Sequence, residues 1–202
     1  MADTDRMRWN QRYLQEKGPG DAPNRWLVDA AAWLASHEAA AAQQGRSPVA
    51  LDIACGVGGA VHWLAARGWQ ATGVDLSDVA LATARRQAHL LGVGVRCVFV
   101  CADLDHWRPL VDSVDLCTCF YFLDRALWPA LMAAVRPGGL VIWRTFDRRR
   151  LAQRPATHPA HLLEPGEPAA YVQAAGWSLL RAEHDADGVT SGVIARKPAT
   201  EG

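Results

Sequence analysis

The sequence lacks an excess of charge of either sign. Its 21 basic and 21 acidic residues give a formal net charge of zero over 202 residues. Nucleic-acid-binding domains usually show a basic excess, and disordered acidic tails show the opposite one. The balance therefore argues against a nucleic-acid partner and against a disordered tail.

Long hydrophobic runs and an export signal are also lacking. The stretch from residue 30 to residue 42 is the most apolar, but Ser36, His37 and Glu38 interrupt it, so it is too short and too polar to span a bilayer. The first six residues are charged and have no apolar core, unlike a secretory signal. Five cysteines without such a signal are typical of reduced thiols. We therefore expect a cytoplasmic protein with no membrane partner.

Short apolar runs alternate with helix-like stretches through most of the chain. Such alternation predicts a doubly wound, three-layer α/β fold with a mostly parallel sheet. Asp-Gly at 187–188 separates the last two runs, which predicts an antiparallel C-terminal hairpin. Helices are expected at 4–17, 24–44, 58–67, 77–91, from 129 to about 136, and at 168–175. Strands are expected at 49–53, 70–74, 95–100, 114–120, 140–145, 177–184 and 189–196.

A glycine-rich turn follows the first expected strand, in Asp52-Ile-Ala-Cys-Gly-Val-Gly-Gly59. Glycines there let the backbone approach a ligand without a Cβ in the way. Ligands of open parallel sheets bind beyond the carboxyl ends of the strands. Asp75 follows the second strand and can accept hydrogen bonds from both hydroxyls of a ribose. Asp103 follows the third strand and can accept one from an exocyclic amine of adenine, so the sequence predicts a nucleoside pocket.

The glycine-rich turn resembles that of the Rossmann-like, class I S-adenosylmethionine-dependent methyltransferases. Three further segments share the resemblance: Gly73-Val-Asp-Leu-Ser77, Ala102-Asp-Leu104 and Arg136-Pro-Gly-Gly-Leu140. Within that class, the chain looks most like small-molecule enzymes of the tellurite-resistance type. The narrower likeness comes from Arg8-Trp-Asn-Gln-Arg-Tyr13 and from the segment 159–167. His158 and His161 depart from the apolar residues that relatives often carry there.

The resemblance implies the cofactor S-adenosylmethionine and a role for each matching residue. Gly56 and Gly58 approach its methionine part, Asp52 holds the amino group, and Asp75 takes the ribose. Leu76 and Ser77 line the adenine, Asp103 and Leu104 read its edge, and Phe120 flanks the methionine moiety. The implied cofactor-binding set is Asp52, Ala54, Cys55, Gly56, Gly58, Asp75, Leu76, Ser77, Asp103, Leu104 and Phe120.

In these terms, we expect one methyltransferase domain over residues 1–202. Residues 1–48 form a helical cap, 49–147 the cofactor-binding core, 148–170 a substrate-side loop, and 171–198 the end of the last helix and the hairpin. No metal is expected. Cys97 lies on the third strand, with Cys101 directly after it, and Cys117 and Cys119 lie on the fourth. The family's strand order separates these two strands by roughly 14 Å. Zinc–sulfur bonds of about 2.3 Å cannot bridge that distance.

Transfer from a sulfonium needs an aligned acceptor and exclusion of water more than it needs a base. A general base is required only for a weakly acidic hydroxyl or amine. The catalytic residue is therefore left open, with Tyr13, Tyr121, His158 and His161 as candidates; Trp9 and Tyr13 either close a lid over the cofactor or simply dock the first helix.

Five arginines gather after the fifth strand. They are either a solvated face or a surface that attracts an anionic substrate. The set is Arg144, Arg148, Arg149, Arg150 and Arg154.

The expected function is methyl transfer from S-adenosylmethionine to a small molecule, at an undetermined S, Se, Te, O or N atom, by a monomer or homodimer. A non-catalytic S-adenosylmethionine-binding protein remains an alternative. An NAD(P)-dependent oxidoreductase shares the glycine turn and Asp75, but Val61 replaces its third glycine. Lys17 and Lys197 are the only lysines, so a Tyr-x-x-x-Lys pair is missing.

Overall fold

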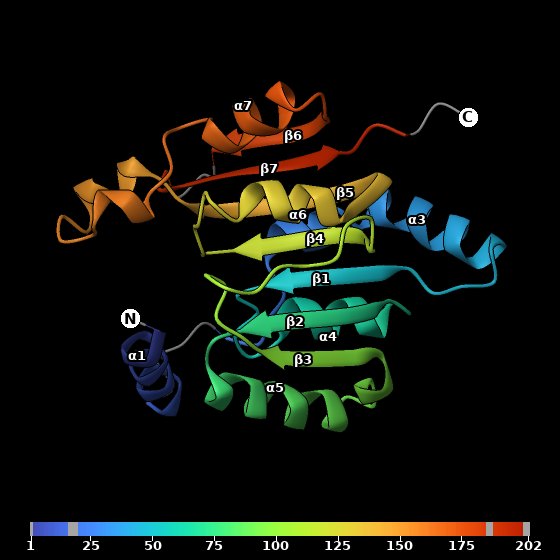
Figure 1. Cartoon of the computed structure of the whole chain (residues 1–202), viewed down its shortest axis with the longest axis horizontal. Helices are drawn as coiled ribbons and strands as arrows, with labels where there is room; N and C mark the ends of the chain where they lie inside the picture. Colours follow the sequence, from blue (N-terminus) through green and yellow to red (C-terminus); the bar gives the residue numbers. More distant parts are fainter. Residues whose placement is uncertain (1, 16–19, 185–187, 200–202) are drawn as a thin grey trace. The chain divides into compact units, whose positions relative to one another are not determined.

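The first three strands form a parallel array with β2 (Gln70–Asp75) between β1 (Val49–Ile53) and β3 (Cys97–Cys101). Most residues of β1 and β2 are buried, as expected for apolar strands, whereas β3 is half-exposed. The structure, a computed structural model, describes residues 2–15, 20–184 and 188–199. It divides the chain into two compact units, residues 1–108 and 109–202, and the three strands belong to the first (Figure 1).

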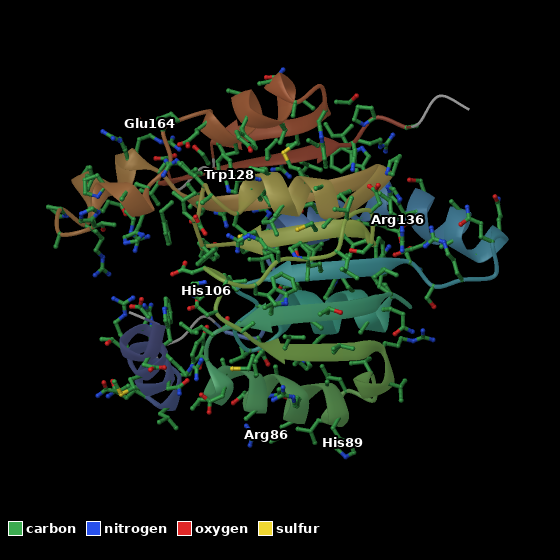
Figure 2. The ribbon with its side chains drawn as sticks, in the orientation of Figure 1. Arg86, His89, His106, Trp128, Arg136 and Glu164 are labelled. Atoms are coloured by element: carbon green, nitrogen blue, oxygen red, sulfur yellow. The ribbon has the colours of Figure 1, made fainter. Side chains whose placement is uncertain are left out.

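Two helices pack on these strands, α4 (Gly59–Ala66) mainly on β2 and α5 (Asp78–Leu90) mainly on β3. The apolar face of α5 is buried through Ala80, Leu81, Ala84 and Ala88. Its other face is exposed, and Arg86 and His89 point away from the strands (Figure 2). This amphipathic pattern is why the segment forms a helix that covers a sheet. A 3₁₀ turn (Gly94–Arg96) then leads into β3.

The helical region before β1 differs from the prediction. A single helix over 24–44 is wrong, because Ala30 ends α2 (Arg25–Asp29) and also precedes α3 (Ala31–Gln43). Trp26 and Leu27 before this break and Leu34 and Ala41 after it are all buried. The bend lets both segments bury their apolar residues, and an alanine-rich sequence carries no local sign of it. The first helix, α1, covers Ala2–Leu14.

One acidic side chain fixes α3 to the strand layer. Glu38 accepts two hydrogen bonds from the Arg67 guanidinium, both 2.9 Å long, and one from the Trp69 indole at 2.8 Å. Trp69 is fully buried, so its N–H needs this partner.

The second unit has the strand order β4-β5-β7-β6. The strands β4 (Val114–Phe120) and β5 (Val135–Phe146) are parallel, whereas β7 (Thr190–Arg196) runs antiparallel to both β5 and β6 (Ser178–His184). This order confirms the predicted antiparallel strands at the C-terminus. The predicted turn falls on residues 185–187, which lie outside the described residues. The parallel pairs of both units confirm the predicted mostly parallel, doubly wound α/β class.

The start of β5 also differs from the prediction of 140–145. The strand already begins at Val135, and the segment Arg136–Gly139 is part of it. The pairing with β4 shifts register between Val114 and Leu116, which accommodates the Pro-Gly-Gly sequence. A Cβ at Gly139 would lie 2.8 Å from the Asp115 carbonyl oxygen, so only glycine fits there.

Aromatic rings hold the helices of the second unit against its strands. Trp128, at the start of α6 (Trp128–Ala134), stacks on Trp143 of β5 with ring centroids 5.3 Å apart. Tyr171 of α7 (Glu167–Ala174) meets the same indole edge-on at 4.8 Å. Two 3₁₀ turns, Arg148–Ala152 and Pro159–His161, lie between β5 and α7. In the described part of the chain, no helix is long and apolar enough to cross a bilayer.

Candidate functional site

The turn between β1 and α4 has an unusual backbone. Ala54, Gly56 and Gly58 all adopt the left-handed conformation, with φ of 52°, 53° and 86°. Such a conformation is strained for alanine and costs on the order of 1 kcal/mol or more, a cost that proteins keep mainly at functional sites. The Gly58 N–H donates to the Cys55 carbonyl at 3.0 Å, which closes the turn. The result is a stretch of bare backbone at the carboxyl end of β1, directly before a helix N-terminus.

Asp75 joins this turn to the end of β2. Its carboxylate accepts one hydrogen bond from the Gly56 N–H and one from the Ser77 N–H, both 2.8 Å long. Only 8% of Asp75 is exposed, and burial raises its pKa, although the backbone N–H groups act in the opposite direction. Each oxygen keeps a further lone pair, so the carboxylate can still accept from a ligand hydroxyl. Ser77 also caps α5, because its Oγ accepts from the Ala80 N–H at 3.1 Å.

The end of β3 reaches the same place. The Ala102 N–H donates to the backbone carbonyl of Asp75 at 3.0 Å. The next residue, Asp103, is half-buried and accepts from the Asp105 N–H at 3.0 Å, while Leu104 is 7% exposed. The structure therefore brings the predicted residues at the ends of β1, β2 and β3 to one edge of the first unit.

Asp52 and Cys55 lie behind the turn. Asp52 is buried at the end of β1, where its Cα pairs with that of Gly73. Cys55 is also buried, and a Cβ at Gly73 would lie 2.6 Å from its Sγ. Burial, and then the carboxylates of Asp52 and Asp75, raises the pKa of the Cys55 thiol. A thiol held protonated in this way fills space and is a poor nucleophile.

The first helix contributes two side chains to this edge. The Tyr13 hydroxyl lies above Gly56, at a point only 2.6 Å from where a Cβ of that residue would be. Asn10 accepts a hydrogen bond from the Ser77 hydroxyl and donates one to Asp78, both at 2.7 Å. Burial, and then the charge of Asp75, raises the pKa of Tyr13 well above its usual value. Sequence reasoning missed Asn10, although its position three residues before Tyr13 places both on one helix face.

His62 is a second residue that the sequence did not single out. It lies on α4, is 5% exposed, and its Nε2 is 2.9 Å from the Ala84 carbonyl of α5. Burial lowers its pKa. A neutral imidazole that donates to this carbonyl joins the two helices beside Gly58.

The other predicted residues belong to the second unit. Phe120 ends β4, and Tyr121 follows it in the left-handed conformation with φ of 59°. The histidines are exposed on the 3₁₀ turn before α7: His158 Nδ1 accepts from the Ala160 N–H at 3.2 Å, and its ring lies 5.7 Å from that of His161. In the described residues, no group of three or more His, Cys, Asp or Glu side chains is placed to hold a metal ion.

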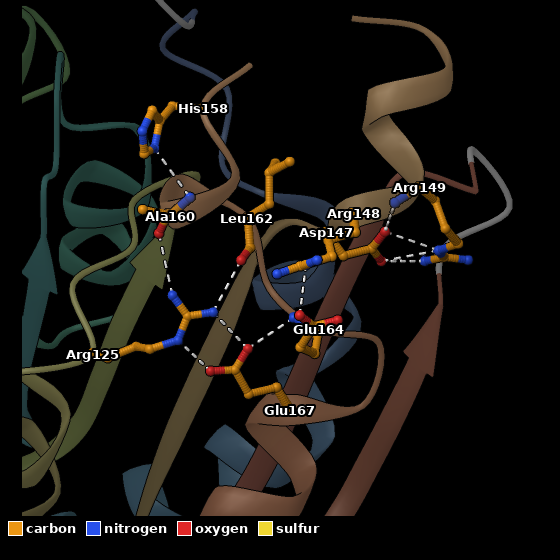
Figure 3. A network of polar contacts seen from close by, with 9 residues as sticks. All are labelled: Arg125, Asp147, Arg148, Arg149, His158, Ala160, Leu162, Glu164 and Glu167. Carbon is orange, nitrogen blue, oxygen red and sulfur yellow. Dashed lines mark hydrogen bonds and ion pairs between the residues drawn. The ribbon is translucent and has the colours of Figure 1, made fainter. Parts of the chain in front are cut away.

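The arginines after β5 divide into groups with different neighbours (Figure 3). Arg148 forms an ion pair with Glu164 at 2.6 Å, and Arg149 forms a bidentate pair with Asp147. Asp147 is fully buried. Burial acts to raise its pKa, but the hydrogen bonds from Arg149 and Ser191 outweigh that effect and hold the pKa below its usual value. Arg148 therefore joins two parts of the 148–167 segment, whereas Arg149 links its start to Asp147 and to the Thr190 carbonyl.

Arg125 holds the far end of that segment, and sequence reasoning missed it. Its guanidinium donates to the carbonyls of Ala160 and Leu162, at 3.2 and 3.0 Å, and to both carboxylate oxygens of Glu167 (Figure 3). Glu167 accepts a further bond from the Glu164 N–H at 2.8 Å. The partners lie 35–42 positions along the chain from Arg125, so no local pattern could reveal them.

Comparison with known proteins shows what part of the chain resembles. Residues 50–139 match the family profile described as "Methyltransferase domain". The chain is 36% identical over 104 residues to the ubiquinone biosynthesis O-methyltransferase of Aromatoleum aromaticum. The matched region covers 48% of this chain and 44% of that protein. With the same enzyme of Bordetella avium it shares 29% over 165 residues, 71% of this chain and 66% of that protein. The chain spans about half the length of most curated relatives it matches.

Solved structures show the same fold. The magnesium protoporphyrin IX methyltransferase of Synechocystis PCC 6803, with bound SAH, has a TM-score of 0.67 at 17% identity and covers 97% of this chain and 99% of that one. An S-adenosylmethionine-dependent methyltransferase of Mesorhizobium loti has a TM-score of 0.62 at 19% identity, covering 75% and 91%. The fold is thus the Rossmann-like fold of class I S-adenosylmethionine-dependent methyltransferases. The narrower likeness to the tellurite-resistance type stays a prediction.

Proposed function

We propose that this chain, whose residues 50–139 match the methyltransferase-domain profile, transfers a methyl group from S-adenosylmethionine to a small-molecule acceptor. The observation that carries the proposal is the position of Asp75. Its buried carboxylate is fixed by two backbone N–H groups at the end of β2, beside a turn whose glycines leave the backbone bare. A carboxylate that is held in this way is oriented before a ribose arrives, which lowers the cost of binding.

The residues of this edge fit the cofactor. Asp75 would accept from the ribose hydroxyls, while Asp103 and Leu104 would contact the adenine. Gly56 and Gly58 would let the backbone lie against the methionine part, and Asp52, Ala54, Cys55, Leu76 and Ser77 would complete the wall. A Cβ at Gly56 would lie 2.6 Å from the Tyr13 hydroxyl, so glycine is also needed there to admit this side chain. Phe120 remains a proposed neighbour of the methionine moiety by family resemblance.

When bound, the cofactor supplies a methyl group that is already electrophilic. The chain's own part is then to orient the acceptor and exclude water. Tyr13 suits water exclusion, because its half-buried side chain places the hydroxyl over the backbone of Gly56. Burial raises the pKa of Tyr13, which favours a role as a hydrogen-bond donor over one as a general base. Tyr121, His158 and His161 stay candidates for contact with the acceptor.

The matched relatives bear on which atom accepts the methyl group. Those matched at 36% and 29% identity are named O-methyltransferases, which supports an oxygen acceptor over sulfur, selenium, tellurium or nitrogen. The zero net charge supports a small molecule over a nucleic acid. All five cysteines are free thiols in the structure, which supports a reducing compartment such as the cytoplasm.

Calorimetric titration with S-adenosylmethionine and S-adenosylhomocysteine tests the proposal. We expect both to bind the wild-type protein and Asp75→Ala to weaken both by about tenfold to a hundredfold, the value of one or two hydrogen bonds to a charged group. Asp105→Ala is the matched control, since it removes an exposed carboxylate just beyond Asp103. NADH should not bind. Absence of binding by both sulfur compounds to a cooperatively melting protein would refute the proposal, and NADH binding would favour the oxidoreductase alternative.

A further inference from the structure

Four side chains of the second unit form a row in which cations and aromatic rings alternate. The Arg144 guanidinium lies 5.3 Å from the centroid of the Tyr121 ring, and that ring lies 5.1 Å from the ring of Phe146. The Arg150 guanidinium lies 3.4 Å from the centroid of the Phe146 ring. We call Arg144, Tyr121, Phe146 and Arg150 the cation–aromatic row. It begins where β4 and β5 end, at the carboxyl edge where ligands of parallel sheets bind.

The backbone of Tyr121 is strained to place its ring in this row. A φ of 59° is rare for a bulky residue and persists only when the surroundings enforce it. The Tyr121 N–H donates to the Arg144 carbonyl at 2.8 Å, and the Arg144 guanidinium donates to the Tyr121 hydroxyl. With both ends fixed, 43% of Tyr121 is still exposed. A large aromatic ring that is rigid, strained and half-exposed is more typical of a binding surface than of a core.

Both cations of the row contact aromatic side chains. Among the neighbouring arginines, Arg148 forms an ion pair with Glu164 and Arg149 forms one with Asp147 (Figure 3). Arg144 is 9% exposed and donates to two hydroxyls, those of Tyr121 and Thr190, whereas Arg150 stands on the face of Phe146. The row therefore combines positive charge with aromatic faces.

We propose that the cation–aromatic row is the acceptor-binding surface and that it takes a planar aromatic anion. A planar ring stacks on aromatic side chains with centroids about 4.5–7 Å apart, and guanidinium groups attract a carboxylate or phenolate. Tyr121 directly follows Phe120, the residue that the family resemblance places beside the methionine moiety. The inference rests on the proposed function only in identifying the bound anion as the methyl acceptor. Binding of the anion can be measured whether or not the protein transfers a methyl group.

The probes for the test are 2-naphthoate, 2-naphthol and cyclohexanecarboxylate at neutral pH, titrated calorimetrically with and without S-adenosylhomocysteine. The first is planar and anionic, the second planar and neutral, and the third anionic but not planar. We expect 2-naphthoate to bind about tenfold or more tightly than either of the others, and to weaken as salt is added. Tyr121→Leu should lose about tenfold in affinity for 2-naphthoate, whereas Tyr121→Phe keeps the ring and should stay within about threefold.

Arg150→Gln and Arg154→Gln form the matched pair of charge variants. Both remove one guanidinium from the same segment, but Arg154 is exposed and outside the row. We expect only Arg150→Gln to weaken 2-naphthoate binding, by about threefold to tenfold. This pair also decides the question if Tyr121→Leu does not fold, as judged by its circular-dichroism melting curve.

Three outcomes separate this inference from the proposed function. Equal affinity for the three probes overturns the inference, and so does an equal loss of 2-naphthoate affinity in Arg150→Gln and Arg154→Gln. If S-adenosylhomocysteine still binds in that case, the proposed function stays intact. Selective 2-naphthoate binding without S-adenosylhomocysteine binding supports the row and overturns the methyltransferase proposal. Failure of all ligands to bind overturns both.

Discussion

The Ser77 hydroxyl donates a hydrogen bond of 2.7 Å to the side-chain oxygen of Asn10, 67 positions earlier in the chain. Through this contact the first helix is bound to the turn that carries Asp75. The neighbouring Asn10–Asp78 bond reinforces it. The helix that covers the candidate cofactor edge is therefore held by specific polar contacts with the residues of that edge.

Asn10→Ala should release this helix. The substitution removes two hydrogen bonds, each worth about 0.5–1.5 kcal/mol net. We expect amide hydrogen exchange in α1 to become roughly tenfold faster, while the amides of β1 and β2 keep their wild-type rates. Gln11→Ala, at an exposed position of the same helix, is the control and should leave exchange unchanged. Equal rates in wild type and Asn10→Ala would show that these bonds do not hold the helix.

Gly59→Ala should destabilise the protein. A Cβ there would lie 2.5 Å from the Asp21 carbonyl oxygen and 2.8 Å from that of Ala22, and backbone atoms cannot rotate away. Overpacking of this kind costs about 1–3 kcal/mol, or roughly 3–9 °C in melting temperature for a chain of this size. A Cβ at Gly20 meets nothing within 4 Å, so Gly20→Ala should melt like the wild type. Matching melting curves for the two variants would contradict the crowding argument.

Arg125→Gln and Glu164→Gln should differ in stability, although each breaks an ion pair. Arg125 donates to two carbonyls as well as to Glu167, so its loss leaves several acceptors without that donor. We expect Arg125→Gln to lower the free energy of unfolding by about 1–2 kcal/mol. The Arg148–Glu164 pair is about half exposed on both sides and should contribute less than about 1 kcal/mol. Urea unfolding of the two variants measures the difference. A larger loss in Glu164→Gln would reverse this ranking.

Asp147 should make the stability of the protein fall in acid. Its pKa is lowered from the ordinary 3.8, so its ionised form stabilises the folded state at every pH above that value. This contribution is lost as the pH falls from about 4 through the lowered pKa, because the folded state must then take up the proton. Asp147→Asn should melt at a lower temperature near neutral pH and show a flatter dependence on pH below 4.

Melting temperatures between pH 7 and pH 2 check this expectation. Asp105→Asn serves as the control, because its carboxylate is exposed and far from Arg149 in the sequence. A wild-type slope that persists in Asp147→Asn would assign the acid sensitivity to other carboxylates.

Much of the candidate cofactor edge could be predicted from the sequence. The apolar runs of β1 and β2, the glycines after β1 and the carboxylate of Asp75 lie within short segments whose conformation local patterns determine. Parallel strands place their carboxyl ends together, so three such segments predict one edge without further information. The predicted helix over 24–44 was wrong for the complementary reason, since the break at Ala30 depends on what Trp26 and Leu34 pack against.

The sequence by itself determined the fold class, the glycine turn and the position of Asp75, because each follows from local conformational preference and hydrophobic periodicity. Only the tertiary structure decided that Asn10 bonds Ser77, that Arg125 bonds Glu167, that Arg148 pairs with Glu164, and that Arg150 stands on the ring of Phe146. These contacts join side chains from distant or separately placed elements. Their partners are selected by packing and by the need to satisfy buried polar groups, and neither leaves a periodic signal in the chain.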